Sequence, residues 1–496
     1  MLFARSDNYH WSHTVRHFLF DGIFCALGFW MAVALRFQEL LPEKTWSYLP
    51  AVMMAALTLP VACYICGLYS PVESDRRTRE RLALVCLSLG VMTLVVLAVG
   101  SINFDARVGR GVQAIGIGLT AVLVLGHHVI LCQRLGSKPE RLACVISQPQ
   151  DEAAVAAFAK LDRMHRNLVG VFTTAGMAPP LHLPWLGTVD EIEAKVGELG
   201  ITRVVCMDEH LFHSTTARSL RVLRYNGVRV TTLAQAFEDS YQTVALELVS
   251  DLWLLTASAH PEVVYIRKLK RAFDILVVLA LLLVLGPVCL LGMLLVLITC
   301  GRPIFYRQVR TGRLGKPFEI LKLRSMRTDA EVAGAQWCGK KDPRVTPLGN
   351  FMRKFRIDEI PQLFNILKGE MSFVGPRPER PEFIEQLVKE IPLFSERLML
   401  PPGLTGWAQV NYPYGASVDD ARRKLEYDLY YLKHMGLLLD IFILLDTVKT
   451  VLKGGASVRY RAGRDLSEAL SKVEGRGQPP LASLLSSVQP VALQDM

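Results

Sequence analysis

The sequence predicts a membrane protein that combines α and α/β parts: four transmembrane helices, a small parallel-sheet domain, then a re-entrant membrane helix with an α-rich interfacial domain. Three observations predict this class. Of the 496 residues, 51% are hydrophobic, and the mean hydropathy is +0.28, as in membrane proteins. Long apolar stretches occur near the start of the chain and again after residue 271. Between them, short apolar runs alternate with helical patterns, which is typical of a parallel sheet.

Residues 1–137 are predicted to form the four-helix transmembrane region. Its apolar stretches are 17–37, 49–69, 82–104 and 111–133. Each is near the ~20 residues that a bilayer span requires. The link between the second and third stretches carries four arginines, whereas the other links hold few charges. Because positive residues concentrate on the cytoplasmic side, we expect this link, the N-terminus and everything after Arg134 in the cytoplasm.

Two charged residues, Asp21 and Arg36, fall inside or at the ends of the first span. We expect an acid at the membrane interface and an arginine that extends its side chain toward water. The alternative is an ion path. We set it aside because nothing else in the four spans is charged enough to continue a relay.

Residues 138–250 are predicted to form a small Rossmann-like domain. Short apolar strands are expected at 141–147, 168–173, 202–207 and 228–233, with helices at 151–164, from 188, and at 214–225. A dinucleotide site would need glycines directly after the first strand. Residues 147–152 contain none. We therefore expect a degenerate nucleotide motif and a regulatory or assembly role.

A connector at 251–271 leads to the fifth apolar segment, residues 272–300. The segment is long enough to cross a bilayer, but both of its flanks are basic, so both are expected in the cytoplasm. Pro287 removes a helical hydrogen bond in the middle of the segment and favours a bend. We expect a re-entrant helix with Pro287 at the bend. A simple kinked span is the alternative.

The domain at 301–455 is organised around two adjacent carboxylates, Asp358 and Glu359. Basic residues precede them and apolar residues follow at helical spacing. The basic residues are Arg353, Lys354 and Arg356, and the apolar ones are Ile360, Leu363, Phe364 and Leu367. An acid that opens a helix is commonly a cap. A carboxylate beside basic side chains at a helix start is also where a phosphate can be held and attacked. The two interpretations are compatible.

The stretch at 347–378 resembles the catalytic core of the bacterial sugar transferases, the monotopic polyprenyl-phosphate phosphoglycosyl transferases. Further motifs match in family order between about 262 and 455: KLRSM at 322–326, DPRVT at 342–346, PGLTGWAQVN at 402–411 and YDLYY at 427–431. The runs at 377–383 and 411–417 are most similar to long members, with a polytopic N-terminal region, that initiate exopolysaccharide synthesis as undecaprenyl-phosphate glucose phosphotransferases do.

This resemblance implies a phosphotransferase that moves a sugar 1-phosphate from a UDP-sugar, with glucose or galactose as the sugar, to undecaprenyl phosphate and releases UMP. Asp358 would form a phosphosugar-aspartate intermediate, and Glu359 would be catalytic and help to bind magnesium. The residues expected to bind substrate are Lys322, Arg324, Arg353, Arg377 and Asp428. The reaction would be the first membrane step of exopolysaccharide or capsule synthesis.

The resemblance also implies a multi-pass protein of the bacterial inner membrane, surrounded by membrane lipids, with its catalytic domain on the cytoplasmic face. The net charge of +10 suits such a surface and anionic phosphates better than nucleic acid, which is not expected as a partner. A homo-oligomer and contacts with other polysaccharide-assembly proteins stay open. The stretch 436–452 is expected either in the interface plane or in a core, and 456–496 as a flexible tail.

Two other classes fit parts of the chain. Four spans with an α/β domain also describe membrane-bound nucleotide-sugar dehydratases or epimerases. Their glycine fingerprint and Tyr-x-x-x-Lys pair do not occur in this sequence. A non-enzymatic scaffold for polysaccharide assembly would have no reason to hold Asp358, Glu359 and the basic residues together.

Overall fold

The computed structural model describes residues 9–39, 44–69, 78–102, 107–135, 140–147, 166–174, 184–208, 211–212, 216–258, 268–330, 342–413, 415 and 417–452. The predicted tail at 456–496 and helix at 151–164 lie outside these residues, as does most of the arginine-rich link. The chain divides into two compact units. Unit 1 comprises residues 1–138 and 441–453, and unit 2 comprises residues 139–440 and 454–496.

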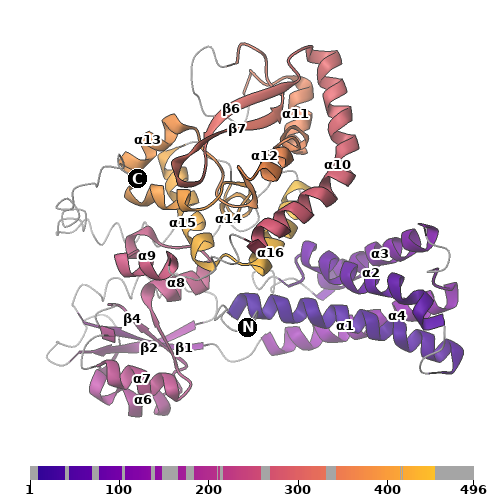
Figure 1. Cartoon of the computed structure of the whole chain (residues 1–496). Helices are drawn as coiled ribbons and strands as arrows, with labels where there is room; N and C mark the ends of the chain where they lie inside the picture. The colour runs from indigo at the N-terminus through magenta and orange to yellow at the C-terminus, as the bar shows by residue number, and fades with distance from the viewer. Residues whose placement is uncertain are drawn as a thin grey trace. The chain divides into compact units, whose positions relative to one another are not determined.

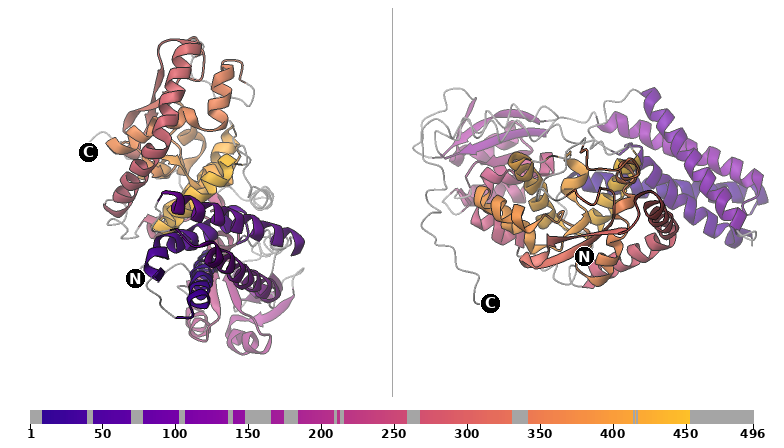
Figure 2. Two further views of the ribbon diagram at one scale, coloured as in Figure 1. Left: turned by 90° about the vertical axis from the view of Figure 1, so that its right-hand side faces the viewer. Right: turned by 90° about the horizontal axis from the view of Figure 1, so that it is seen from above.

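Unit 1 contains four long apolar helices that run side by side (Figures 1 and 2). They are α1 (Tyr9–Phe37), α2 (Lys44–Ile65), α3 (Thr78–Ile102) and α4 (Arg110–Leu135). Each includes a stretch of at least 20 residues that is long and apolar enough to cross a membrane. Large apolar side chains such as Leu94 and Val122 are exposed on the outside, at 68% and 69%. These are the helices of a membrane protein.

Small residues let α1 and α4 approach closely. A side chain at Gly28 would overlap the backbone and hydroxyl of Thr120, and one at Gly116 would overlap the ring of Phe29. Such contacts hold apolar helices together where lipid removes the hydrophobic driving force. Phe29 itself is fully buried in the core of the bundle.

The expectation for Asp21 was wrong, whereas Arg36 is exposed as expected. Asp21 has no exposed surface. It lies inside the bundle because histidine and tyrosine side chains of unit 1 supply the hydrogen bonds that a carboxylate needs away from water.

Helix α16 (Leu437–Leu452) is the stretch that was expected either in the interface plane or in a core. Within unit 1, the ring of Phe442 lies 6.5 Å from that of Phe18 and 5.0 Å from that of Tyr64, centroid to centroid. Phe442 and Ile443 are buried. One face of the helix is therefore a core face.

Unit 2 begins with the predicted parallel sheet, whose strand order is β3-β2-β1-β4-β5. The strands are β1 (Glu140–Ile146), β2 (Arg166–Thr173), β3 (Trp185–Thr188), β4 (Arg203–Cys206) and β5 (Arg229–Thr232). Four of them match the predicted apolar runs. The edge strand β3 escaped prediction because its four residues are mostly part-exposed and form no apolar run.

Successive residues of β1 point to opposite faces of the sheet, and each face has its own core. Ala143 and Val145 pack with α6 (Ile192–Glu198) and α7 (Ala217–Tyr225). Cys144 packs on the other side with α8 (Leu233–Tyr241). Figure 1 shows these helices on the two sides of the sheet.

The sheet domain is joined to the rest of unit 2 through the side chain of Glu238 on α8, which is 3% exposed. Its carboxylate pairs with Lys433 at 2.9 Å and His434 at 3.1 Å, both on α15 (Val418–His434). It also accepts a hydrogen bond from the indole of Trp253 at 2.6 Å. Trp253 belongs to α9 (Asp251–Ser258), a helix within the predicted connector.

Helix α10 (Lys270–Cys300) contains Pro287 and bends along its length (Figure 1). Both of its ends contact the same C-terminal domain. Near the start, Asp274 accepts hydrogen bonds from the Ser372 hydroxyl at 2.8 Å and the Phe373 amide at 3.1 Å. Near the end, Val296 packs with Leu323 and Met352. The middle is exposed, as Leu283 shows at 81%.

The C-terminal domain combines short helices with two small sheets. A hairpin, β6 (Phe305–Thr311) and β7 (Pro317–Leu323), is antiparallel, and β8 (Ser372–Val374) pairs in parallel with β9 (Gly403–Thr405). A 3-10 turn, η6 (Arg313–Gly315), joins the two strands of the hairpin. Between β7 and β9 the helical elements described are α11 (Pro347–Lys354), η7 (Ile357–Glu359), α12 (Gln362–Lys368), α13 (Pro381–Glu390) and η8 (Pro392–Met399). A short helix, α14 (Trp407–Asn411), and then α15 follow.

Candidate active site

The two adjacent carboxylates lie on a single 3-10 turn, η7, rather than at the start of a longer helix. The α-helix begins four residues after Asp358, at Gln362, and Pro361 stands directly before it. Arg356 precedes the turn with a left-handed backbone, φ 58° and ψ 21°, which redirects the chain after α11. This separate turn keeps both carboxylates off the regular helix, and Glu359 contacts β7 and the segment after β8.

Glu359 is held by three cations. Its Oε1 lies 3.1 Å from Lys322 Nζ and 2.8 Å from Arg377 Nη2, and its Oε2 lies 3.3 Å from Arg356 Nη1. The side chain is 7% exposed. Burial alone would raise the pKa of Glu359, but Arg377, Lys322 and Arg356 together hold it well below its usual value. Glu359 is therefore ionised and fixed in place.

Asp358 has the opposite environment. It is 5% exposed, and among the residues described its Oδ1 has no hydrogen-bond partner. Burial, and then the negative charge of Glu359, raise the pKa of Asp358, although Lys322, Arg353 and Arg356 oppose that shift. A poorly solvated carboxylate with a free oxygen is a reactive one.

Arg377 is positioned by further side chains. Its Nη1 donates to Gln409 Oε1 at 3.0 Å, and its backbone carbonyl accepts from Arg397 Nη2 at 3.0 Å. Arg397 pairs with Asp428 at 2.9 Å, and both are buried. Burial raises the pKa of Asp428 to about 6 in spite of Arg397. Asp428 is thus linked to Glu359 through two residues, Arg397 and Arg377.

Glycines bring the backbone of the Arg377 turn close to its neighbours. A side chain at Gly403 would overlap the backbone of Gly375, and one at Gly406 would overlap the Gly375 carbonyl. Both belong to the motif at 402–411, so this motif sets the position of the turn that carries Arg377.

Arg324 and Arg353 lie at other places. Arg324 donates to the carbonyl groups of Cys300 and Gly301 and so caps the end of α10. Its Nε and Nη1 are buried without a hydrogen-bond partner in the part of the chain described. Arg353 Nε donates to the Ser325 hydroxyl at 2.9 Å, and its charge acts on Asp358.

The structure thus brings Lys322, Arg356 and Arg377 to Glu359. Asp428 is linked to Arg377 through Arg397, whereas Arg324 contacts the end of α10 instead. Two site residues were missed by the sequence analysis, Gln409 and Arg397. Gln409 lies in a quoted motif, so the motif was a signal for it. Arg397 lies on η8, outside every quoted motif, so the sequence contained no signal for it.

A family model described as bacterial sugar transferase matches residues 265–454. The exopolysaccharide production protein PSS of Rhizobium leguminosarum bv. phaseoli is 38% identical over 196 residues, which cover 38% of this chain and 96% of that protein. This chain belongs to the bacterial sugar transferase family.

Two relatives that are longer than the Rhizobium protein also match this sugar transferase. The UDP-N-acetylgalactosamine-undecaprenyl-phosphate N-acetylgalactosaminephosphotransferase of Aeromonas hydrophila is 42% identical over 186 residues, 38% of this chain and 44% of that protein. The UDP-glucose:undecaprenyl-phosphate glucose-1-phosphate transferase of Escherichia coli (strain K12) is 38% identical over 184 residues, 37% and 40% of the two chains. The match spans less than half of either relative.

The carboxylate pair of the sugar transferase suits magnesium by its chemistry. Mg²⁺ takes oxygen ligands and is commonly held by one or two carboxylates plus phosphates of the substrate. The free Oδ1 of Asp358 is such an oxygen. The Glu359 oxygens, which pair with Lys322 and Arg377, are a second possible source.

Aromatic side chains close in sequence to the carboxylate turn of the sugar transferase are exposed. Phe351 on α11 is 54% exposed, Phe355 directly after α11 is 45% exposed, and Phe364 on α12 is 50% exposed. Phe364 is one of the apolar residues that follow the carboxylates at helical spacing. Large apolar residues exposed beside a polar site are typical of a surface that meets lipid.

Proposed function

We propose that this sugar transferase moves a sugar 1-phosphate from a UDP-sugar to undecaprenyl phosphate and releases UMP. The observation that carries the proposal is the contrast within one turn. Glu359 is neutralised by three cations, whereas Asp358 beside it keeps a buried oxygen without a hydrogen-bond partner among the described residues. In this proposal Glu359 holds the cations in position, and Asp358 acts as the nucleophile.

In the proposed reaction, an oxygen of Asp358 attacks the β-phosphorus of the UDP-sugar. The bond between that phosphorus and the bridging oxygen breaks, and UMP leaves with the electron pair. The phosphosugar is then attached to Asp358. A phosphate oxygen of undecaprenyl phosphate attacks the same phosphorus, and Asp358 leaves as a carboxylate. The product is an undecaprenyl-diphosphate sugar, and no proton acceptor is needed for either displacement.

The cations explain how a carboxylate can approach a phosphate. Two unit charges of the same sign 4 Å apart repel by about 4 kcal/mol at an effective dielectric of 20. Lys322 and Arg377 already contact Glu359, and the charges of Lys322, Arg353 and Arg356 act on Asp358. In this proposal they bind the phosphate oxygens. Magnesium, when bound at Asp358 and Glu359, would spread further negative charge.

The sugar is proposed to be glucose or galactose, and N-acetylgalactosamine is tested beside them because one relative is named for that sugar. The proposed setting is the bacterial inner membrane with the site on its cytoplasmic face. The relatives from Aeromonas hydrophila and Escherichia coli are named for undecaprenyl phosphate, which supports this setting.

We also propose that α10 is re-entrant. A straight helix of 31 residues would be about 46 Å long at 1.5 Å per residue and would separate its ends across the bilayer. Here Asp274 and Val296 both contact one compact domain. Single cysteines at Lys268 and Arg302, in a chain without its other cysteines, should both react with an impermeant maleimide applied to inside-out vesicles. Labelling of only one of them from that side would show a simple span.

The experiment that tests the reaction is nucleotide release by the full chain in nanodiscs with magnesium, undecaprenyl phosphate and a panel of UDP-sugars. We expect UMP from one sugar and none with Asp358→Asn. Arg307→Lys is the matched control, because Arg307 is an exposed cation of β6 whose partner Glu319 is also exposed. Release of UDP instead of UMP would mean ordinary glycosyl transfer and would overturn the proposal.

A further inference from the structure

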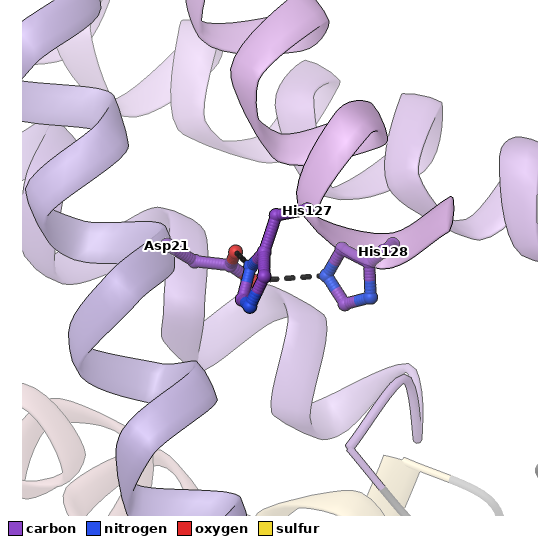
Figure 3. Close-up of side chains that lie close together, drawn as sticks. All are labelled: Asp21, His127 and His128. Carbon is purple, nitrogen blue, oxygen red and sulfur yellow. Dashed lines mark hydrogen bonds and ion pairs between the residues drawn. The ribbon is translucent and has the colours of Figure 1, made fainter. Parts of the chain in front are cut away.

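A second buried carboxylate lies in unit 1, far along the sequence from the sugar transferase motifs. Asp21 on α1 meets two consecutive histidines of α4, His127 and His128 (Figure 3). His127 Nδ1 lies 2.8 Å from Asp21 Oδ1, and His128 Nε2 lies 3.0 Å from Asp21 Oδ2. The three ligand atoms, one from each side chain, lie within 4.8 Å of one another.

Two of these three side chains have an outer partner that orients them. The Tyr69 hydroxyl donates to Asp21 Oδ2 at 2.6 Å. The other ring nitrogen of His127, Nε2, lies 2.9 Å from Nδ1 of His17. Outer partners of this kind fix the orientation of metal-binding carboxylates and imidazoles in proteins. The site therefore has three possible metal ligands, and hydrogen bonds fix the orientation of two of them, Asp21 and His127.

Charge is the reason to look for a cation here. Asp21 is fully buried among apolar helices, and a buried carboxylate needs a positive partner. Within the part of the chain that the structure describes, its ion-pair partners are the two histidines, with no lysine or arginine. Neutral imidazoles supply hydrogen bonds but no charge. Either a protonated imidazole or a metal ion must balance the carboxylate.

We propose that Asp21, His127 and His128 bind a divalent transition metal ion of the zinc type. Imidazole nitrogen and carboxylate oxygen are ligands that Zn²⁺ accepts, at about 2.0–2.2 Å. In a tetrahedral site such bonds place neighbouring ligand atoms about 3.4 Å apart. The 2.8 Å from His127 Nδ1 to Asp21 Oδ1 would widen by about 0.6 Å. His128 Nε2 lies 3.0 Å from the other oxygen, Oδ2, and the three ligand atoms, now within 4.8 Å of one another, would draw together around the ion. Solvent supplies the fourth ligand beside His127, whose side chain is 12% exposed.

The ion would fasten the membrane helices of unit 1 at one end of the bundle. It joins α1 to α4 directly, and the hydrogen bond from Tyr69 ties in the segment after α2. The role is structural, because no reacting group of the sugar transferase site takes part. The inference does not depend on the proposed reaction.

The test uses the full chain in nanodiscs, stripped with a chelator and then titrated with Zn²⁺, or with Co²⁺ as a spectroscopic probe. We expect one high-affinity ion per chain. Asp21→Asn and His128→Gln should weaken binding at least 100-fold, and Tyr69→Phe about 10-fold, because outer partners contribute less than ligands. The Co²⁺ spectrum should show nitrogen and oxygen ligands in wild type and lose this signature in Asp21→Asn.

Two controls separate this site from others. His434→Gln removes an imidazole that also pairs with a buried carboxylate, Glu238, but in unit 2. It should leave the metal affinity unchanged, as should Asp358→Asn. Tyr69→Phe keeps the test meaningful if the ligand variants do not fold. The proposal is overturned if wild type holds no more zinc than Asp21→Asn, or if Asp358→Asn alone abolishes binding.

Discussion

Glu359 in unit 2 and Asp21 in unit 1 are both buried carboxylates, but their partners differ in kind. Glu359 is paired with one ammonium and two guanidinium groups, and the guanidinium groups carry a charge at every physiological pH. Asp21 is paired with two imidazoles and a phenol, which need not be charged. The side chains that pair with each carboxylate therefore determine what each site can bind. Fixed cations can receive phosphates, whereas imidazoles can receive a metal ion.

Asp358 sharpens this contrast because it is buried with less support than either of the other two. Its Oδ1 has no hydrogen-bond partner among the described residues, whereas both oxygens of Asp21 are hydrogen bonded. A group kept ionised against its environment costs stability. Such a cost is expected at a reactive group and not at a structural one.

The largest expected effect follows directly from that difference. Asp358→Asn should lower sugar-phosphate transfer at least about 10³-fold, since it removes the nucleophile, and should leave the unfolding temperature equal or higher. Asp21→Asn should lower the unfolding temperature, because it removes the negative charge and one of the two acceptor oxygens that join α1 to α4. Nucleotide release and thermal unfolding in nanodiscs measure both quantities. A large loss of stability in Asp358→Asn would contradict the assignment.

The next effect concerns the geometry of a cation. Arg377 contacts Glu359 and Gln409 with two different nitrogens, which lysine cannot reproduce. Arg377→Lys should reduce kcat/KM about 10²-fold, as for loss of one positioned donor. The exposed Arg307→Lys should change it less than twofold. Equal, small effects of the two substitutions would show that Arg377 serves only as a general positive charge.

A smaller effect is expected in the pH profile. Asp358 must be ionised to attack, and its pKa is raised, so the rate should fall as pH falls through a value above the usual 3.8. Glu359→Gln removes the neighbouring negative charge and should move this acid limb to lower pH, whatever activity remains. The dependence of kcat/KM on pH for both proteins tests this. An acid limb that stays in place would exclude Asp358 as its source.

The smallest effect is on stability. The pKa of Asp428 is about 6, above the unfolded value, so its contribution to stability is complete below about pH 4 and is lost as pH rises through 6. Relative to wild type, Asp428→Asn should therefore gain stability between pH 4 and 7, by at most about 3 kcal/mol. The difference in unfolding temperature across this range measures it. A relative loss would mean that the pairing with Arg397 outweighs burial.

The carboxylate pair could be predicted from sequence because its motif places acids, cations and an apolar run within a few residues. Lys322 lies well before the two carboxylates in the sequence and Arg377 well after them. Both were predicted as substrate-binding residues through the family resemblance. Arg397 was beyond prediction, since it reaches the site by packing of η8 against α15.

The four apolar helices and four strands of the sheet followed from hydropathy and alternation, whereas β3 is too short and too exposed for either signal. Asp21 and His127 are 106 residues apart, and no motif joins them. We predicted an interfacial acid because only charged residues were considered as partners. Two adjacent histidines at the end of an apolar span were the signal that was available.

The most direct measurement of the central claim follows the β-phosphorus. The full chain in nanodiscs is incubated with UDP-sugar labelled at that phosphorus, without undecaprenyl phosphate, and the protein is analysed for bound label. We predict up to one labelled phosphosugar per chain on the peptide that contains Asp358, no label in Asp358→Asn, and transfer of the label to lipid when undecaprenyl phosphate is added. UMP formation that requires the lipid from the start, with no label on the protein, would contradict the account.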